Sequence, residues 1–269
     1  MKTKLFLVLF LVFGILNASI IEMKHMREVS KYVDKNTLLI FDLDNTLIEL
    51  PQHLGSEEWF YNTFQDYKKK KMSEEEALQN TLLKFFAVQH LSQVRIVEEN
   101  SDKIIQDLQK KNFSIIGLTT RHMELSLCTA FQLESLNINL LKTSPSDKEV
   151  FFNNPRSVLF KNGLGSVLFK NGILFTSGTD KGKALFTLLE KINYHPKKIV
   201  FVNDKLSHLK EVEIACENNK ISFVGVRYSF LDDKINIPKR EISDLQFKHF
   251  NDSILTDHEA ELMFNLTNK

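Results

Sequence analysis

The sequence predicts an α/β fold in which helices cover both faces of a parallel sheet, and two observations lead to this prediction. Short runs of consecutive apolar residues recur along the chain, and segments with apolar residues at helical spacing lie between most of them. A strand that is apolar at consecutive positions is typical of a sheet buried on both faces. Alternation of strands and helices favours parallel strands joined by right-handed crossovers.

Each expected element comes from one of these two patterns. Residues 20–33 carry apolar residues at roughly helical spacing and precede the first buried run, LLIF. The expected strands are Thr37–Phe41, Phe113–Leu118, a run at Leu159 with its repeated copy, Lys198–Val202 and Ile221–Val226. The expected helices between them are Ser101–Lys110, Met123–Leu136, Lys183–Ile192 and Leu206–Asn218.

A helix-rich segment interrupts the alternation and predicts an insert over the sheet. Residues 48–99 include a capping-box pattern at Ser73 and Glu76, followed by an apolar stripe. We therefore expect a core formed by residues 19–47 and 100–269, with 48–99 as a helical cap. Aromatic residues near Trp59 could stack on a base or a sugar, but the core of the insert itself is the favoured interpretation.

Composition excludes several classes of protein. Lys and Arg total 35 against 34 Asp and Glu, so charge does not indicate a nucleic-acid polymer as partner. The hydrophobic content of 43% with 22 Phe excludes intrinsic disorder. Two cysteines, Cys128 and Cys216, allow at most one disulfide and exclude both a disulfide scaffold and a zinc-type spacing.

The first 18 residues resemble a secretory signal peptide. Lys2 and Lys4 precede an apolar run from Leu5 to Leu16, and small residues follow. The run is short for a spanning helix, which needs about 20 apolar residues. We expect an exported protein, periplasmic or secreted, with no stable membrane span after signal cleavage; a retained N-terminal anchor is the alternative.

A tandem duplication follows the expected helix Met123–Leu136. Residues 157–165 read SVLFKNGLG, and residues 166–174 read SVLFKNGIL. Each copy carries an Asn-Gly turn signal after an apolar run, which favours β-hairpin strands. Two copies are too few for a solenoid, so the duplication predicts local structure and no function.

Two carboxylates follow the first buried strand and are the strongest indication of chemistry. Asp42 and Asp44 stand one residue apart in DLDNTL, at the carboxyl end of the strand, where open α/β sheets bind ligands. Such a pair can provide a nucleophile, a proton donor and a divalent-cation site. A turn built from Asp and Asn is the structural alternative.

This motif resembles the first motif of the haloacid dehalogenase (HAD) superfamily, an apolar strand followed by Asp-x-Asp-x-Thr. The resemblance implies a three-layer Rossmannoid sandwich with a central parallel sheet and a small helical cap. It implies Asp42 as the nucleophile that forms an aspartyl phosphate, and Asp44 as the general acid and base. An acid at the second position is typical of phosphatases and disfavours dehalogenation, whereas a phosphomutase stays open.

The resemblance extends to a second and a third motif in the expected order. IIGLTTR provides Thr119, or alternatively Thr120, whose hydroxyl is expected to bind a phosphoryl oxygen, with Arg121 as a candidate substrate contact. TDKGKAL provides Lys181, or less favourably Lys183, to neutralise the nucleophile and the phosphate. Thr46 in the first motif is a further candidate for substrate binding.

The fourth motif completes an expected Mg²⁺ site. KIVFVND provides Asp204, so Asp42, Asp204 and the Asp44 main-chain carbonyl are the implied ligands. Asn203 stands where many relatives carry a first acid. Because Mg²⁺ prefers hard, charged oxygen ligands, this substitution bears on metal affinity and turnover.

The four motifs together predict an exported, Mg²⁺-dependent phosphomonoester hydrolase that acts on a small phosphorylated molecule. LGSEEWF at residues 54–60 and the tail at residues 245–260 resemble an uncharacterised, signal-bearing bacterial branch of the superfamily that lends no substrate. A non-catalytic secreted binding protein on the same fold is the alternative, because a fold does not determine a function.

Overall fold

The computed structural model describes residues 18–155, 164–235, 240–250 and 254–267. Residues 1–17 of the expected signal peptide lie outside this range. The same holds for residues 157–163 of the first duplicated copy, including the strand expected at Leu159.

The described residues form a central sheet of eight strands, six of which run parallel. The last two strands pair antiparallel at one edge. In spatial order the strands are β1 (Ala18–Met23), β10 (Ser222–Tyr228), β9 (Lys198–Asn203), β2 (Thr37–Phe41), β5 (Ser114–Thr119), β8 (Ile173–Phe175), β7 (Leu164–Lys170) and β6 (Val150–Pro155).

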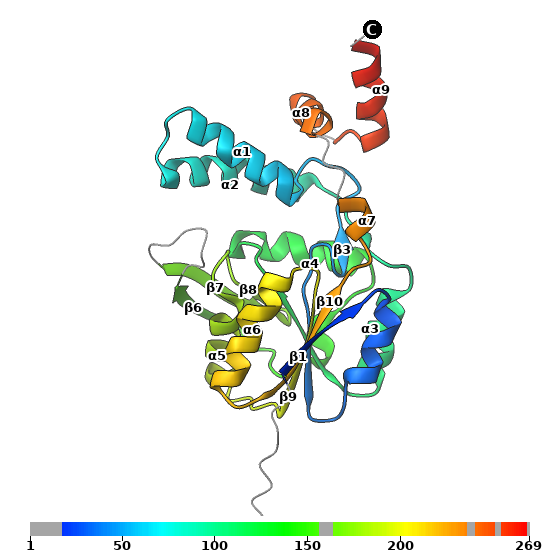
Figure 1. Ribbon diagram of the computed structural model, residues 1–269, viewed down its shortest axis with the longest axis vertical. Helices are drawn as coiled ribbons and strands as arrows, with labels where there is room; N and C mark the ends of the chain where they lie inside the picture. The colour runs from blue at the N-terminus through cyan, green and yellow to red at the C-terminus, as the bar shows by residue number, and fades with distance from the viewer. Residues whose placement is uncertain (1–17, 156–163, 236–239, 251–253, 268–269) are drawn as a thin grey trace, which may run out of the picture.

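Helices cover both faces of this sheet (Figure 1). One face packs against η1 (Met26–Tyr32), α3 (Ser101–Lys110), α4 (Ser126–Ser135) and η3 (Leu140–Thr143). The other face packs against α5 (Lys181–Lys191) and α6 (Leu206–Asn218). The short elements η2 (Met123–Leu125) and α7 (Asp232–Ile235) follow β5 and β10.

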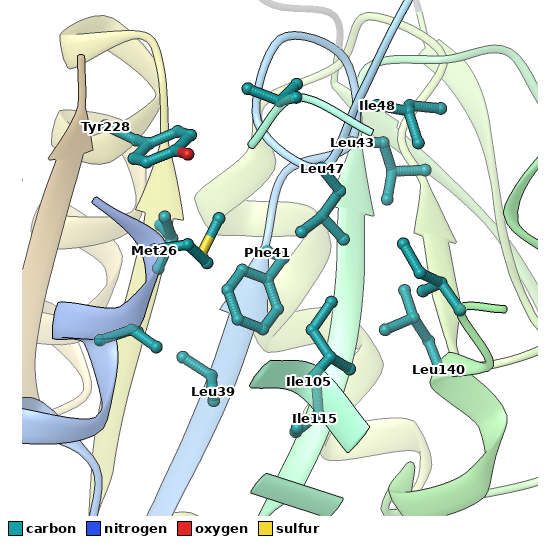
Figure 2. Close-up of a cluster of buried hydrophobic side chains, with 14 of the residues drawn as sticks. Met26, Leu39, Phe41, Leu43, Leu47, Ile48, Ile105, Ile115, Leu140 and Tyr228 are labelled. Carbon is teal, nitrogen blue, oxygen red and sulfur yellow. The ribbon is translucent and has the colours of Figure 1, made fainter. Parts of the chain in front are cut away.

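The central strand β2 shows why consecutive apolar residues are needed. Leu39 and Phe41 point into one core and Leu38 and Ile40 into the other, so every position of the strand is buried. Figure 2 shows Leu39 and Phe41 among the side chains of the first core. The predicted three-layer α/β sandwich with a central, mostly parallel sheet is confirmed.

Residues 48–99 form a helical pair above the carboxyl edge of the sheet (Figure 1). The short strands β3 (Ile48–Glu49) and β4 (Arg95–Ile96) pair antiparallel at its base. The helices are α1 (Glu57–Lys69) and α2 (Glu74–Leu91). The capping box at the start of α2 forms as the sequence predicts, with Ser73 and Glu76 bonded reciprocally. We call residues 48–99 the cap.

Of the two C-terminal helices, the first packs on the cap rather than on the sheet, and the second packs against the first (Figure 1). They are α8 (Arg240–Lys248) and α9 (Asp257–Thr267). The ring centroids of Trp59 in α1 and Phe247 in α8 lie 5.5 Å apart, and the Leu54 amide donates to Gln246 Oε1 at 2.9 Å. The expectation that residues 100–269 all join the α/β core does not anticipate this packing.

Residues 20–33 differ from the helical expectation. Residues up to Met23 form β1, which pairs in parallel with β10, and only the segment from Met26 forms a 3₁₀-helix. Apolar residues in this stretch fit either spacing, and pairing with a neighbouring strand decides between them.

The second duplicated copy forms the predicted hairpin. It contributes β7 and β8, which pair antiparallel around Asn171 and Gly172. Both turn residues have positive φ, 53° and 74°, as a two-residue hairpin of this kind requires.

Neither cysteine forms a disulfide: Cys128 and Cys216 are free, buried thiols. Within the described ranges, none of the helices combines the length and the apolar character needed to cross a membrane.

Candidate active site

The predicted motifs meet at the carboxyl edge of the sheet. Asp42 follows β2, and Lys181 begins α5 on one face of the sheet. The Lys181 Nζ donates to Asp42 Oδ1 at 2.8 Å and to the Leu118 carbonyl at 3.1 Å. Both side chains are buried, and Lys181 is fully so. Burial raises the pKa of Asp42, and the nearby Lys181 charge opposes this rise.

The start of α5 explains how a lysine reaches this place. Asp180 caps the helix by accepting from the Lys183 amide at 2.8 Å, and Glu211 in α6 accepts from the Lys181 amide at 2.9 Å. Gly182 lets the two helices approach closely, because a Cβ there would lie 2.2 Å from the Glu211 carbonyl oxygen. The close contact of α5 with α6 fixes the direction in which Lys181 enters the site.

Asp44 is held by a buried arginine. Arg121 donates from Nε and Nη2 to the two carboxylate oxygens of Asp44, at 2.8 Å each. Its Nη1 donates to Thr129 at 3.0 Å and to Gln132 at 2.6 Å. Burial lowers the pKa of Arg121, but the charge of Asp44, the hydrogen bond to Asp44 and the charges of Cys128 and Asp42 together raise it overall. Four of the five guanidinium N–H groups therefore bond within the protein.

The turn after β2 orients the two carboxylates. Asn45 takes a positive φ of 60°, which Asn tolerates well, and the Leu43 carbonyl accepts from the amides of Thr46, Leu47 and Ile48. Thr46 is fully buried, and its hydroxyl oxygen accepts from the Asp204 amide at 3.2 Å. Thr46 thus ties the first motif to the fourth.

Thr119 and Thr120 differ sharply in environment. Thr119 is buried at the end of β5, and its hydroxyl oxygen accepts from the Arg121 amide at 3.1 Å. Its hydroxyl proton is left to donate. Thr120 is exposed, and its main-chain carbonyl accepts from Gly178. The predicted preference for Thr119 as a phosphoryl ligand remains a prediction.

Asp204 is the strongest indication of a cation site. Its Oδ1 is buried and has no hydrogen-bond partner among the described residues. Burial and the neighbouring charge of Asp42 raise the pKa of Asp204 to about 7. The buried Asp42 carboxylate and the partly buried Asp204 carboxylate repel each other, and one Asp204 oxygen has no partner among the described residues. A divalent cation fits this arrangement, because it would relieve both the repulsion and the unsatisfied oxygen.

The side chains at this edge are few for an all-protein metal cage. Within the described part of the chain, no three His, Cys, Asp or Glu side chains group as a metal site. Mg²⁺ commonly keeps several waters and uses only one or two carboxylates, so Asp42 and Asp204 suffice for that ion. Asn203 is buried and accepts from the Lys205 amide at 2.7 Å, which forms the turn rather than a ligand position.

A salt bridge joins the cap to the fourth motif. Lys205 Nζ contacts the Glu57 carboxylate at the start of α1. Burial lowers the pKa of Lys205, but the charges of Glu57, Asp204 and Asp42 raise it overall. Burial, together with the charges of Lys181 and Lys205, lowers the pKa of the nearby His208 to about 2.

Comparison with known proteins places the chain in a family. The family model described as "Protein of unknown function (DUF2608)" matches residues 22–261. The chain belongs to this family.

Relatives of this DUF2608 chain include proteins of Chlamydia and Rickettsia. A Chlamydia pneumoniae protein named "Putative outer membrane protein" is 23% identical over 259 residues, covering 94% of this chain and 93% of that protein. An uncharacterised protein of Rickettsia prowazekii is 25% identical over 245 residues, covering 87% of this chain and 85% of the relative.

One similar solved structure is a haloacid dehalogenase-like hydrolase from Streptococcus pneumoniae. It is 13% identical, with a TM-score of 0.43, and the match covers 70% of this chain and 93% of that chain. The chemistry assigned to this DUF2608 site therefore rests on its own side chains.

The structure brings most of the predicted residues together and adds others that the sequence does not indicate. It places Lys181 rather than Lys183 against Asp42. Reasoning from sequence missed Gln132, Thr129 and the pair Lys205 with Glu57. Glu57 is 148 residues from Lys205 in the chain, and ordinary polar residues in helices carry no local signal of such contacts.

Proposed function

We propose that this DUF2608 protein is an exported, Mg²⁺-dependent phosphomonoester hydrolase acting through an aspartyl phosphate. The observation that carries the proposal is the fully buried Lys181 bonded to Asp42, beside the unsatisfied oxygen of Asp204. Buried charges are costly unless paired, so their presence at a ligand-binding sheet edge supports a function.

In the first step an Asp42 oxygen attacks the phosphorus atom and the bond to the leaving oxygen breaks. Lys181 offsets negative charge on Asp42 and on the transferring group, which is positioning and charge neutralisation rather than covalent chemistry. The Thr119 hydroxyl can donate to a phosphoryl oxygen. The product of this step is a phosphoryl group on Asp42 and an alcohol.

Asp44 moves the protons of both steps. It gives a proton to the leaving oxygen, then takes a proton from the water that attacks phosphorus, and the Asp42–phosphorus bond breaks to release inorganic phosphate. Its carboxylate is about half exposed, so a substrate and a water can reach it. In the observed arrangement Arg121 fixes the direction of this carboxylate.

The fit of Asp42 and Asp204 to a divalent cation supports Mg²⁺ as cofactor, with the Asp44 main-chain carbonyl as a third ligand. Bound Mg²⁺ supplies positive charge that polarises the phosphoryl group and offsets charge that develops during transfer. Asp204 holds its carboxylate in place through the bond from its amide to Thr46.

A small phosphorylated substrate and an exported location complete the proposal. The cap bonds to the site through Glu57 and Lys205, so it limits access to small molecules. The signal-like residues 1–18 and relatives named as outer membrane proteins support export. A retained N-terminal anchor is the alternative within this proposal.

A secreted binding protein is the second candidate, and one observation favours it. Arg121 occupies both oxygens of Asp44, and Asn203 replaces an acid, so the site has fewer free carboxylates than a typical phosphatase of this fold. This candidate requires a folded protein that neither binds Mg²⁺ nor hydrolyses phosphomonoesters.

Hydrolysis of para-nitrophenyl phosphate by the purified protein tests the proposal. Mg²⁺-dependent turnover that disappears in Asp42→Asn and persists in Asp107→Asn, a surface control, is the expected result. Circular dichroism and calorimetric Mg²⁺ titration accompany each sample. Equal rates in Asp42→Asn and the parent would overturn the mechanism. A folded parent with neither turnover nor Mg²⁺ binding would overturn the proposed function and favour the second candidate.

A further inference from the structure

The Arg121 guanidinium donates hydrogen bonds to the protein on two sides. Its Nε and Nη2 face Asp44, and its Nη1 uses both hydrogens, one toward Thr129 and one toward Gln132 in α4. Arg121 is 4% exposed and Thr129 is fully buried. Removing one acceptor of a buried guanidinium costs free energy, because water cannot take the place of that acceptor and the donor is left without a partner.

The orientation of Gln132 is fixed by chemistry. Its Oε1 accepts from Arg121 at 2.6 Å, so its amide nitrogen must face acceptors. These acceptors are the carbonyls of Ser92 at 3.1 Å and Gln89 at 3.3 Å, at the C-terminal end of cap helix α2. Carbonyls at a helix C-terminus have no amide of a following turn as partner. Gln132 donates to two of them, and the Gln89 carbonyl also accepts from the Ser92 amide and the Cys128 thiol, at 3.3 Å each.

Ser92 also connects the two chain segments that join the cap to the sheet. Gln52, in the segment that enters the cap, donates to Ser92 Oγ at 2.9 Å and to the Leu54 carbonyl at 3.3 Å. We call residues 50–54 and 89–94 the cap hinge. Gln52 donates to Ser92, Gln132 donates to the Ser92 carbonyl, and Arg121 donates to Gln132. These hydrogen bonds connect both hinge segments to the arginine.

We propose that Gln132 is a positioning residue that couples the cap hinge to the acid/base group Asp44 through Arg121. This inference rests on the proposed phosphatase function. One amide side chain contacts the hinge at its nitrogen and the guanidinium at its oxygen, so a shift of the α2 carbonyls changes where Arg121 is held. Arg121 in turn sets the direction of both Asp44 oxygens.

Loss of this coupling has a chemical signature. When the general acid is misplaced, the rate of hydrolysis falls most for substrates whose leaving group needs a proton. Para-nitrophenolate leaves without much help, whereas phenolate, with a conjugate-acid pKa near that of tyrosine (about 10), needs protonation. A general loss of structure lowers both rates by the same factor.

The experiment measures kcat and KM for para-nitrophenyl phosphate and phenyl phosphate with Mg²⁺. The main variant is Gln132→Leu, and Thr129→Val is a second one that keeps shape and removes only the other Nη1 acceptor. Gln109→Leu is the matched control, since Gln109 is equally buried and bonds a backbone carbonyl, that of Asn139, at 2.7 Å.

We expect Gln132→Leu to lower kcat on phenyl phosphate by about tenfold and on para-nitrophenyl phosphate by less than about threefold, with KM little changed. Thr129→Val repeats the selectivity more weakly, and the Gln109 control leaves the ratio of the two substrates unchanged. The inference is overturned if Gln132→Leu lowers kcat by the same factor on both substrates, or if neither Gln132→Leu nor Thr129→Val changes the ratio of the two kcat values. In that case the activity of the parent still supports the proposed function. A parent inactive on both substrates overturns the proposed function itself.

Discussion

The buried pair of Lys181 and Asp42 allows a quantitative test of the site without any substrate. Lys181→Met keeps the length and the apolar stem of the side chain and removes the ammonium group that lies 2.8 Å from Asp42 Oδ1. The variant also removes the bond to the Leu118 carbonyl. Asp42, which is 5% exposed, then has no cation within hydrogen-bond distance among the described residues.

The size of the effect follows from burial. Removing one partner of a buried ion pair costs about 3–5 kcal/mol, because the other charge stays buried and uncompensated. Replacing both partners by neutral groups of similar shape costs much less. We therefore expect Lys181→Met to lose about 3 kcal/mol of unfolding free energy, and addition of Asp42→Asn to restore about 2 kcal/mol of that loss.

Urea unfolding at neutral pH in EDTA, followed by circular dichroism, measures these differences for the two single variants and the double variant. Lys183→Met is the control, because this lysine lies two residues further on in the same helix and is exposed. It should change stability by less than about 0.5 kcal/mol. Losses in the two single variants that simply add in the double variant would refute the reasoning, since independent side chains show no coupling.

Three further predictions concern the framework around the site. Gly182→Ala should lose about 2 kcal/mol in urea unfolding, together with activity, because its Cβ would meet the Glu211 carbonyl at 2.2 Å and push α5 away; an unchanged stability contradicts the proposed close contact. His208 has its pKa lowered to about 2, so it is neutral when folded and protonates on unfolding below about 6.5. The neutral imidazole therefore costs no stability at neutral pH, but the protein loses about 2–3 kcal/mol of unfolding free energy near pH 4.5 because the unfolded state binds a proton that the folded state does not. His208→Gln should lose less unfolding free energy on acidification, by this amount, when urea unfolding is measured at both pH values. Trp59 is the only tryptophan and packs on Phe247, so Phe247→Ala should shift its emission to the red with the sheet intact; an unmoved spectrum argues against docking of α8 on the cap.

The central strands could be predicted because both of their faces are buried. LLIF in β2 and IVFV in β9 are apolar at every position, and few other structures tolerate this pattern. Edge strands lack the signal. Alternating burial in β6 and the mixed residues of β1 fit several structures, and only pairing with neighbours far away in the chain decides their conformation.

In the candidate site, too, some contacts could be predicted from the sequence and others depend on how distant segments pack. The resemblance to the haloacid dehalogenase superfamily, through the order of its motifs, predicted that Lys181 and Asp204 would come close to Asp42 at the carboxyl edge of the sheet. Pairing of Arg121 with Asp44 spans 77 residues and depends on how α4 packs, so no local pattern reports it. Arg121 was expected as a substrate contact, and the structure shows most of its donors bonded within the protein.

The charges of the site bear on how phosphate and a divalent cation affect each other's binding. Lys181 matches Asp42, Arg121 matches Asp44, and Lys205 is shared with Glu57 of the cap. Among these charged groups of the site, Asp204 keeps a buried oxygen without a partner among the described residues. A phosphate group that binds alone would therefore bring negative charge close to Asp204, whose carboxylate has no cationic partner of its own, whereas a divalent cation would offset both the phosphate and Asp204. We infer that phosphate and Mg²⁺ bind this site cooperatively, each raising the affinity for the other, because binding free energies are reciprocal.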